Sequence, residues 1–183
     1  MKQLGFLFLV VSPPSFAAEY LELVESKVYE TSGSAEEISK RGELCIAQHV
    51  RNDPIRISDS ADNLLGLGLA KRSTGEIPGG AVIVKADPAA GTVIATVRTP
   101  WSQLLTKNFT QSTLTFLAKE GRFKIQFTSI ETLQQNTGYA ENNGFVRQGK
   151  WIGSSWEKVQ KALLETAEKV ATCTAGTKAS NDW

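Results

Sequence analysis

The sequence contains few of the residues that carry common catalytic chemistry. Its 183 residues include a single histidine, His49, and only two cysteines, Cys45 and Cys173. A metal site built from several histidines is therefore excluded. A Ser-His-Asp or Cys-His site that also uses a second histidine is excluded for the same reason. The cysteines are too far apart for a C-x-x-C redox motif and have too few ligand residues nearby for zinc. We accordingly assign no catalytic residue, no metal and no cofactor.

An excess of charge of one sign is also missing. The chain has 20 basic and 19 acidic residues, a formal net charge of +1, and no basic run richer than Lys71-Arg72. Because a protein that neutralises a phosphate backbone needs a basic excess on one face, nucleic acid is not expected as a partner. The hydrophobic share of 41% and the charged share of 21% are those of a soluble globular protein, and the length suits one domain.

The chain has no apolar run long enough to span a bilayer, which takes about 20 residues. Its longest run, residues 4–11, follows a lysine and precedes two prolines and the Ser-Phe-Ala of residues 15–17. This pattern predicts a secretory signal peptide over residues 1–17. We expect a bacterial protein, periplasmic or secreted, whose mature domain begins at Ala18 and has no transmembrane segment. A retained membrane anchor is the alternative, and the absence of a following cysteine excludes a lipid anchor.

Two capped amphipathic helices are predicted. Ser34 followed by Glu37 is a capping box, which predicts a helix over residues 35–49. Its inward face carries Ile38, Gly42, Cys45, Ile46 and His49. Ser154 with Glu157 repeats the pattern and predicts a second helix. That helix has Trp156, Val159, Leu163, Thr166, Val170 and Cys173 on one side. A polar tail follows over residues 174–183.

Most of the remaining chain reads as short strands. The strongest pair is 112–119 with 122–130, because both alternate apolar and polar residues and Glu120-Gly121 suits a tight turn between them. In residues 64–72 leucines alternate with small residues, so one strand face is bulky and the other nearly bare. The weaker assignments are strands over 20–30 and 55–58, a loop over 74–80, and a hairpin of 81–86 with 92–99. The order of elements predicts an α+β two-layer sandwich, with both helices packed on one face of an antiparallel sheet.

These elements resemble a known group of domains. The export signal, the first capped helix, the glycine-spaced strand and the hairpin with Lys-Glu-Gly-Arg-Phe at residues 119–123 resemble secreted bacterial domains of unknown function with a TATA-box-binding-protein-like (TBP-like) fold. The resemblance covers residues 20–133 and the last helix, whereas the hairpin over 81–99 and residues 134–153 depart from it. It implies no catalytic residue. It implies no DNA binding either, because function resides in particular sites and not in a fold.

The two cysteines are expected to pair. An even number of cysteines in an oxidising compartment favours a disulfide. Cys45 and Cys173 both fall on the apolar faces of predicted helices that should lie side by side on one sheet face. The sequence therefore predicts a bridge that ties the first helix to the last within a single domain over residues 18–173.

Residues 134–153 are the candidate binding segment. They lack periodicity, and long loops in compact domains are often functional. Aromatic faces bind sugars or peptides, and cations supply charge. The candidate ligand-binding residues are Tyr139, Phe145, Arg147, Lys150 and Trp151. The alternative is that the segment folds back and its aromatic side chains fill the bare strand face over Gly66 and Gly68.

The sequence thus favours a noncatalytic exported envelope protein, a small binding or assembly module for a protein or glycan ligand. The alternative function is a secreted hydrolase that uses carboxylates, for which Asp53, Asp59 and Asp62 are the clustered candidates. Two carboxylates that cleave a glycosidic bond lie about 5 to 9 Å apart across a cleft. A binding module predicts no such cleft.

Overall fold

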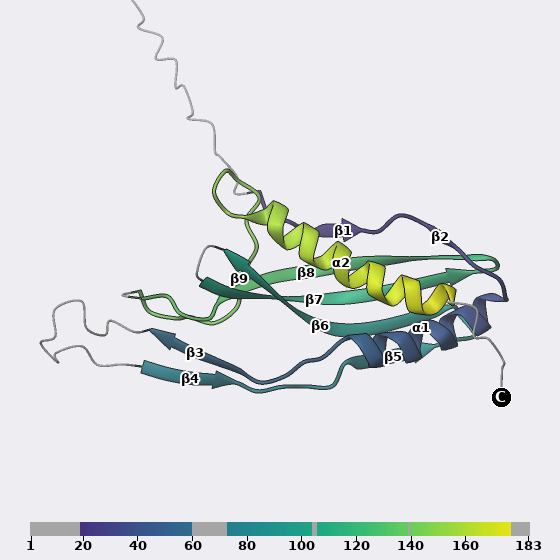
Figure 1. Ribbon diagram of the computed structural model, residues 1–183, viewed down its shortest axis with the longest axis horizontal. Helices are drawn as coiled ribbons and strands as arrows, with labels where there is room; N and C mark the ends of the chain where they lie inside the picture. The colour runs from purple at the N-terminus through teal and green to yellow at the C-terminus, as the bar shows by residue number, and fades with distance from the viewer. Residues whose placement is uncertain (1–18, 60–72, 104–105, 139, 177–183) are drawn as a thin grey trace, which may run out of the picture.

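Two long helices lie on the same face of a seven-stranded antiparallel sheet (Figure 1). The computed structural model describes residues 19–59, 73–103, 106–138 and 140–176. The yellow helix α2 (Trp156–Ala175) runs across the sheet, and α1 (Ala35–His49) lies beside its C-terminal half. This arrangement confirms the predicted α+β class with both helices on one sheet face.

Three long strands form the body of the sheet, in the order β1-β8-β7-β6-β5. They are β6 (Thr92–Gln103), β7 (Thr106–Lys119) and β8 (Arg122–Gln134). The predicted hairpin over 112–130 is confirmed as part of β7 and β8, which both extend further. The shorter strands are β1 (Leu23–Glu25), β2 (Tyr29–Glu30), β5 (Ile83–Asp87) and β9 (Val146–Arg147), and β1, β2 and β9 all pair with β8. The single strand predicted over 20–30 is therefore two short strands.

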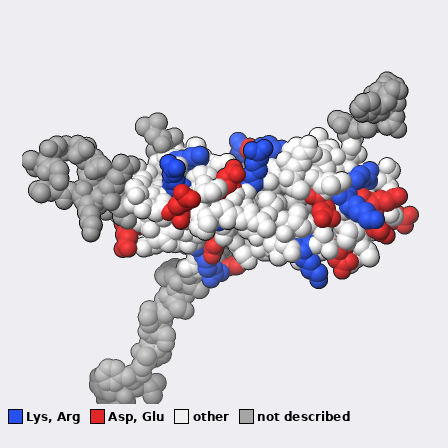
Figure 2. All heavy atoms as spheres, turned by 90° about the horizontal axis from the view of Figure 1, so that it is seen from below, with Lys and Arg blue, Asp and Glu red and all other residues white. Residues whose placement is uncertain are grey.

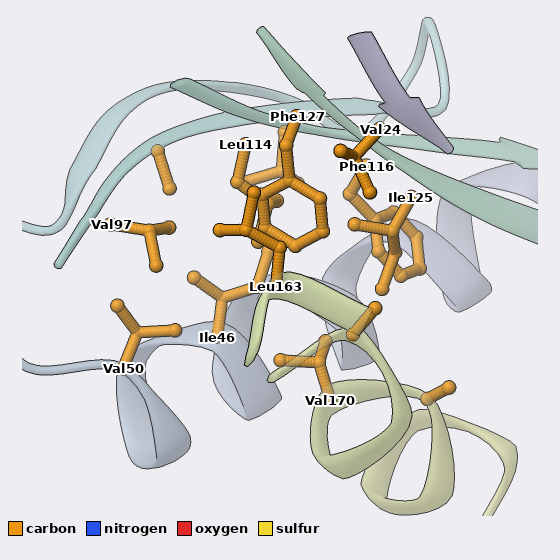
Figure 3. Close-up of a cluster of buried hydrophobic side chains, with 14 of the residues drawn as sticks. Val24, Ile46, Val50, Val97, Leu114, Phe116, Ile125, Phe127, Leu163 and Val170 are labelled. Atoms are coloured by element: carbon orange, nitrogen blue, oxygen red, sulfur yellow. The ribbon is translucent and has the colours of Figure 1, made fainter. Parts of the chain in front are cut away.

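The core lies between the helices and the sheet. Alternate residues of β6, β7 and β8 are buried, as expected for strands with one face turned to a core. Figure 3 shows side chains from both layers meeting there, among them Leu114, Phe116 and Phe127 from the sheet and Leu163 and Val170 from α2. Fully burying such a side chain stabilises the fold by about 1.5 to 3 kcal/mol.

Helix α1 begins at the predicted capping box. The backbone N–H of Glu37 donates to the Ser34 hydroxyl over 3.3 Å, and the backbone N–H of Ser34 donates to the Glu37 carboxylate over 2.8 Å. The predicted inward face is correct up to Ile46. His49, predicted to face inward, is exposed, because the helix ends there and the buried Val50 occupies the next inward position.

Helix α2 begins differently from the prediction, and the second capping box is wrong. The Ser154 hydroxyl lies within donating distance of the carbonyls of both Gly149 and Trp151, over 2.8 and 2.7 Å, and so closes the preceding turn. Ser155 is the N-cap, with a left-handed backbone at φ 59° and no side-chain cap bond. Its hydroxyl instead donates to Gln103 of β6 over 2.5 Å. A tertiary contact therefore takes the place of the local cap.

The disulfide between Cys45 and Cys173 is present and joins α1 to α2. The two Cα atoms lie 5.8 Å apart, within the usual range for a disulfide. The two cysteines are 128 residues apart in sequence, so the bridge connects the first helix to the last, as predicted.

A separate two-stranded ribbon extends past the sheet at the lower left of Figure 1. It consists of β3 (Ile55–Asp59) and β4 (Ser73–Ile77). The loop predicted over 74–80 is wrong for its first four residues, which pair with β3. The strand predicted over 64–72 lies outside the described residues. Ser58 fixes the ribbon to the body, since its N–H donates to Gln135 over 2.9 Å and its carbonyl accepts from Thr137 over 3.2 Å.

The buried carboxamide of Asn52, shortly after α1 in the sequence, joins three segments of the chain. The Asn52 amide group donates to the carbonyls of Ala81 and Thr96, over 3.1 and 2.9 Å. Its oxygen accepts from the backbone N–H of Arg98 over 3.0 Å. A buried polar side chain is stabilising only when it is hydrogen-bonded, and this one satisfies three backbone groups that are not paired in the ladder. Asn52 therefore fixes where the chain leaves α1 and enters the ribbon.

Candidate ligand-binding site

The segment predicted as a loop over 134–153 is held against the end of the sheet. Within it, β9 pairs with β8, and Gln148 extends this pairing because its N–H donates to Ile130 over 3.0 Å. On the other side of the segment, the N–H of Leu21 donates to the Gln148 carbonyl over 2.9 Å. Residues 146–150 are therefore an additional strand between β8 and the start of the described chain, and the rest of the segment crosses the sheet end in turns.

This arrangement forms a cavity of about 540 Å³, which we call the end cavity. Its walls are the ends of β6, β7 and β8, residues 137 and 141–148, and the turn that precedes α2. Six carboxamide side chains line it, together with five Ser or Thr hydroxyls and Trp101. The carboxamides are those of Gln103, Asn108, Gln134, Asn142, Asn143 and Gln148.

Two of these carboxamides are almost completely buried, with 7% of Asn108 and 3% of Gln148 exposed. The Asn108 amide group donates to the Thr106 carbonyl over 3.1 Å. The Gln148 amide group donates to the carbonyls of Gly149 and Ser154, over 2.7 and 2.9 Å. These bonds orient both side chains. Among the described residues no donor reaches the side-chain oxygen of either one.

Trp101 provides an aromatic surface in the cavity wall. It is half-buried on β6, and its indole N–H donates to the Thr110 hydroxyl of β7 over 2.9 Å. A single hydrogen bond at the ring edge satisfies the polar group of the indole and fixes the ring, so that the rest of its surface is available for apolar contact. The cavity thus combines a fixed aromatic side chain with many neutral hydrogen-bonding groups.

The four predicted site residues that the structure describes do not line this cavity. Side chains of successive strand residues point to opposite faces. Val146 and Gln148 line the end cavity, whereas Arg147 lies on the other side, with its Cζ 4.2 Å from the centroid of the Tyr20 ring. Phe145 is half-buried and packs near Arg98, whose Cζ is 5.7 Å from its ring centroid. Tyr139 lies outside the described residues.

Trp151 is the more exposed of the two aromatic candidates that the structure describes, with 51% of its surface accessible. Its ring meets that of Tyr20 edge-on at 6.2 Å between centroids. It also covers Gly149 so closely that a Cβ at that position would overlap the indole. Ile152 follows at the tip of the turn and is fully exposed. Trp151 is therefore a surface residue that rests on the backbone of the additional strand.

Both predicted cations are paired with carboxylates. Arg147 forms an ion pair with Glu22, and Lys150 forms one with Glu19 at 2.9 Å. Each pair is largely exposed, so it contributes little to stability. In each pair the carboxylate balances the positive charge that was predicted to bind a ligand. On the face seen in Figure 2, Lys and Arg side chains lie interspersed with Asp and Glu.

Arg98, which lies near the Phe145 ring, has a structural role. Its guanidinium donates to Gln111 over 3.0 Å and to the carbonyl of Pro78 over 2.8 Å. Burial lowers the pKa of the guanidinium, because it disfavours the charged form. These bonds connect β6, β7 and the chain that leaves the ribbon, and they fix the guanidinium near the Phe145 ring.

Of the carboxylates considered for a hydrolase, Asp53 does not line the end cavity. Asp53 is exposed between α1 and β3, Asp59 is the last residue of β3, and Asp62 lies outside the described residues. The cavity lining includes one carboxylate, that of Glu141.

The sequence does contain a signal for the end cavity, and it lies in β7. The inward positions of β7 change from apolar residues in one half to Asn108, Thr110 and Ser112 in the other. A core-facing strand that becomes polar over half its length indicates either a polar core or a site. The carboxamides at Asn142 and Asn143 are the second part of this signal.

Comparison with known proteins places the fold but not the function. The structure is similar to a DUF4468 family protein from Bacteroides ovatus, with a TM-score of 0.50 and 12% identity over 90% of this chain and 94% of that one. It also matches a TBP-like protein from Parabacteroides distasonis, with a TM-score of 0.47 and 8% identity over 81% and 91% of the two chains. No protein-family model and no curated protein matches the sequence.

The similarity to the DUF4468 family protein agrees with the predicted resemblance to bacterial domains of unknown function. At such low identity it defines the class of fold alone, and the functional argument depends on the site. Among the described residues, neither helix combines the length and hydrophobicity that crossing a membrane requires.

Proposed function

We propose that this protein is a noncatalytic module that is exported to the bacterial cell envelope, where it binds a protein or a glycan in the end cavity. The observation that carries the proposal is the cavity itself, with its six carboxamides and a fixed tryptophan. Small-molecule sites are typically concave, with volumes of about 300 to 1,000 Å³ and a few fixed polar groups, and the cavity has these properties.

Export is supported by two features of different kinds. The first is the signal-like pattern of residues 1–17. The second is the disulfide between Cys45 and Cys173, because structural disulfides persist mainly in oxidising compartments. Both features support a periplasmic or secreted location. The near-neutral charge of the chain supports a partner other than nucleic acid.

Intact-mass analysis tests export. Protein isolated from the envelope fraction of the producing bacterium should lack the first seventeen residues and begin at Ala18, because a signal peptidase cleaves after small residues. It should also carry no free thiol when it is unfolded without reductant. A full-length mass in the soluble envelope fraction, or protein confined to the cytoplasm, would contradict the proposed location.

Co-sedimentation tests binding. The mature protein should sediment with the insoluble envelope fraction, and Asn143→Trp should lower the bound fraction about tenfold. Asn143 is an exposed residue of the cavity wall, so an indole there occupies the space of a ligand without entering the core. The matched control is Val84→Trp, which adds the same side chain at an exposed position of the edge strand β5.

Three results would count against the proposal. One is wild-type protein that stays in the supernatant. Another is Asn143→Trp that binds as well as the control. The third is release of sugar reducing ends or peptide termini from the envelope fraction, which would favour the hydrolase instead. A loss of binding in Trp151→Ala with Asn143→Trp unaffected would move the site to the exposed turn before α2.

A further inference from the structure

The end cavity has a chemical character that selects among ligands, and we propose that it binds a neutral carbohydrate. This inference rests on the proposed function and names the ligand of the same site. Among the side chains that line the cavity, Glu141 is the one that carries a charge. An anionic ligand would lose its hydration there without meeting a cation, whereas neutral hydroxyl groups meet many partners. The lining therefore favours an uncharged polar molecule over a phosphate, a sulfate or an acidic sugar.

The two buried carboxamides supply fixed acceptors. Their amide groups are held by backbone carbonyls, so the side-chain oxygens of Asn108 and Gln148 keep one orientation and remain available for a donor. Neither oxygen is among the fully buried polar atoms that lack a partner, so both can be reached from the cavity. A ligand hydroxyl that donates to either oxygen would replace a hydrogen bond to water with one of fixed geometry. Sugar hydroxyls both donate and accept, as the mixed carboxamide and hydroxyl lining requires.

Trp101 supplies the apolar part of the recognition. A pyranose ring has one face of C–H groups, which packs on an aromatic side chain while its hydroxyls point outward along the ring edge. The Trp101 ring is fixed by its bond to Thr110 and lies in the same wall as Asn108 and Gln103. An aromatic surface bordered by carboxamides therefore matches a sugar ring.

The geometry favours a sugar over a peptide. Proteins that bind extended peptides use a free strand edge or an apolar groove, where main-chain bonds run in one direction. The end cavity instead presents side-chain groups from three directions, namely the strand ends, residues 137 and 141–148, and the turn before α2. A ring with hydroxyls around its circumference satisfies convergent groups of this kind.

Nuclear magnetic resonance titration tests the inference. Isotope-labelled mature protein is titrated with short neutral oligosaccharides of glucose, mannose, galactose and N-acetylglucosamine, and with oligogalacturonate and sulfated galactose as charged probes. At least one neutral sugar should shift the side-chain amide signals of Asn108 and Gln148 and the indole N–H signal of Trp101. The charged probes should leave these signals unchanged.

Matched variants assign the effect to the cavity. Asn108→Ala removes a fixed acceptor and should weaken the affinity for that sugar about tenfold. Gln126→Ala removes a carboxamide from β8 that donates to Glu25 instead, and should bind like wild type. Asn143→Trp, at an exposed position, should weaken binding about tenfold with an unchanged melting temperature, so the test does not depend on whether Asn108→Ala folds.

Each outcome decides between the inference and the proposed function. Neutral sugars that shift these signals at lower concentrations in wild type than in Asn143→Trp support both. Shifts caused by the charged probes alone overturn the neutral class and leave the binding module intact. No shift with any sugar, together with envelope binding that protease treatment of the envelope abolishes, overturns the inference in favour of a protein partner. Absence of sugar shifts and of envelope binding overturns both.

Discussion

Removing the disulfide should lower the free energy of unfolding by up to about 4 to 5 kcal/mol. The loss is measured by urea denaturation of the double variant Cys45→Ala with Cys173→Ala, compared with the oxidised wild-type protein. The large effect arises because the bridge spans 128 residues, and in the chain-entropy model a longer loop restricts the unfolded chain more. A domain of ordinary stability, about 5 to 15 kcal/mol, would lose a large part of its margin.

The dependence on denaturant concentration provides a second readout. Without the bridge the unfolded chain is more expanded, so the m-value should rise as well as the midpoint fall. Ala47→Ser with Ala175→Ser is the matched control, since it alters two exposed positions in the same helices and leaves the bridge in place. A double cysteine variant that unfolds within about 1 kcal/mol of this control would show that the bridge adds little.

The second large effect is expected at Gly42, where α1 lies against the sheet. A Cβ built at this position would lie 2.6 Å from the Phe116 ring, which is fully buried on β7. Gly42→Val adds three carbon atoms at this contact and should destabilise the protein by about 3 kcal/mol, although valine is itself a better helix former than glycine. Thermal unfolding followed by circular dichroism measures the loss.

Two further variants separate this clash from other causes. Ala47→Val places the same branched side chain at an exposed position of α1 and should cost less than about 1 kcal/mol. The double variant Gly42→Val with Phe116→Leu should lose less stability than the sum of the losses of the two single variants. The reason is that leucine leaves free the volume in which the valine overlaps the phenylalanine ring. Purely additive losses would mean that the helix has shifted away from the sheet instead.

The sequence predicted those parts of the fold that local interactions determine. The capping box at Ser34 and Glu37 satisfies itself within one turn, so its position could be predicted to the residue. The alternation around Leu114 and Phe116 likewise reflects the pleat of the strand itself. The disulfide followed from two such helix faces and the expectation that they pack together.

Errors arose where a distant partner determines the structure. The same Ser-x-x-Glu pattern failed at Ser154, because that hydroxyl closes a turn with Gly149 and Trp151. The strand β4 has no apolar alternation and depends on pairing with β3. The end cavity was missed for the same reason, since its carboxamides come from separate segments and converge only when β8 and residues 137 and 141–148 are in place.

The pairing of Leu21 with Gln148 has a consequence for the order of folding. Leu21, near the start of the described chain, pairs with Gln148, which is synthesised much later. This edge of the sheet can therefore close only after most of the polypeptide is available. Contacts of such large sequence separation form slowly, because their loop-closure entropy must be met first. Until Gln148 is in place, Leu21 has no strand neighbour and the edge of β8 at Ile130 stays open to other chains. Maturation of the end cavity is therefore a late event, in which the two extremes of the domain meet.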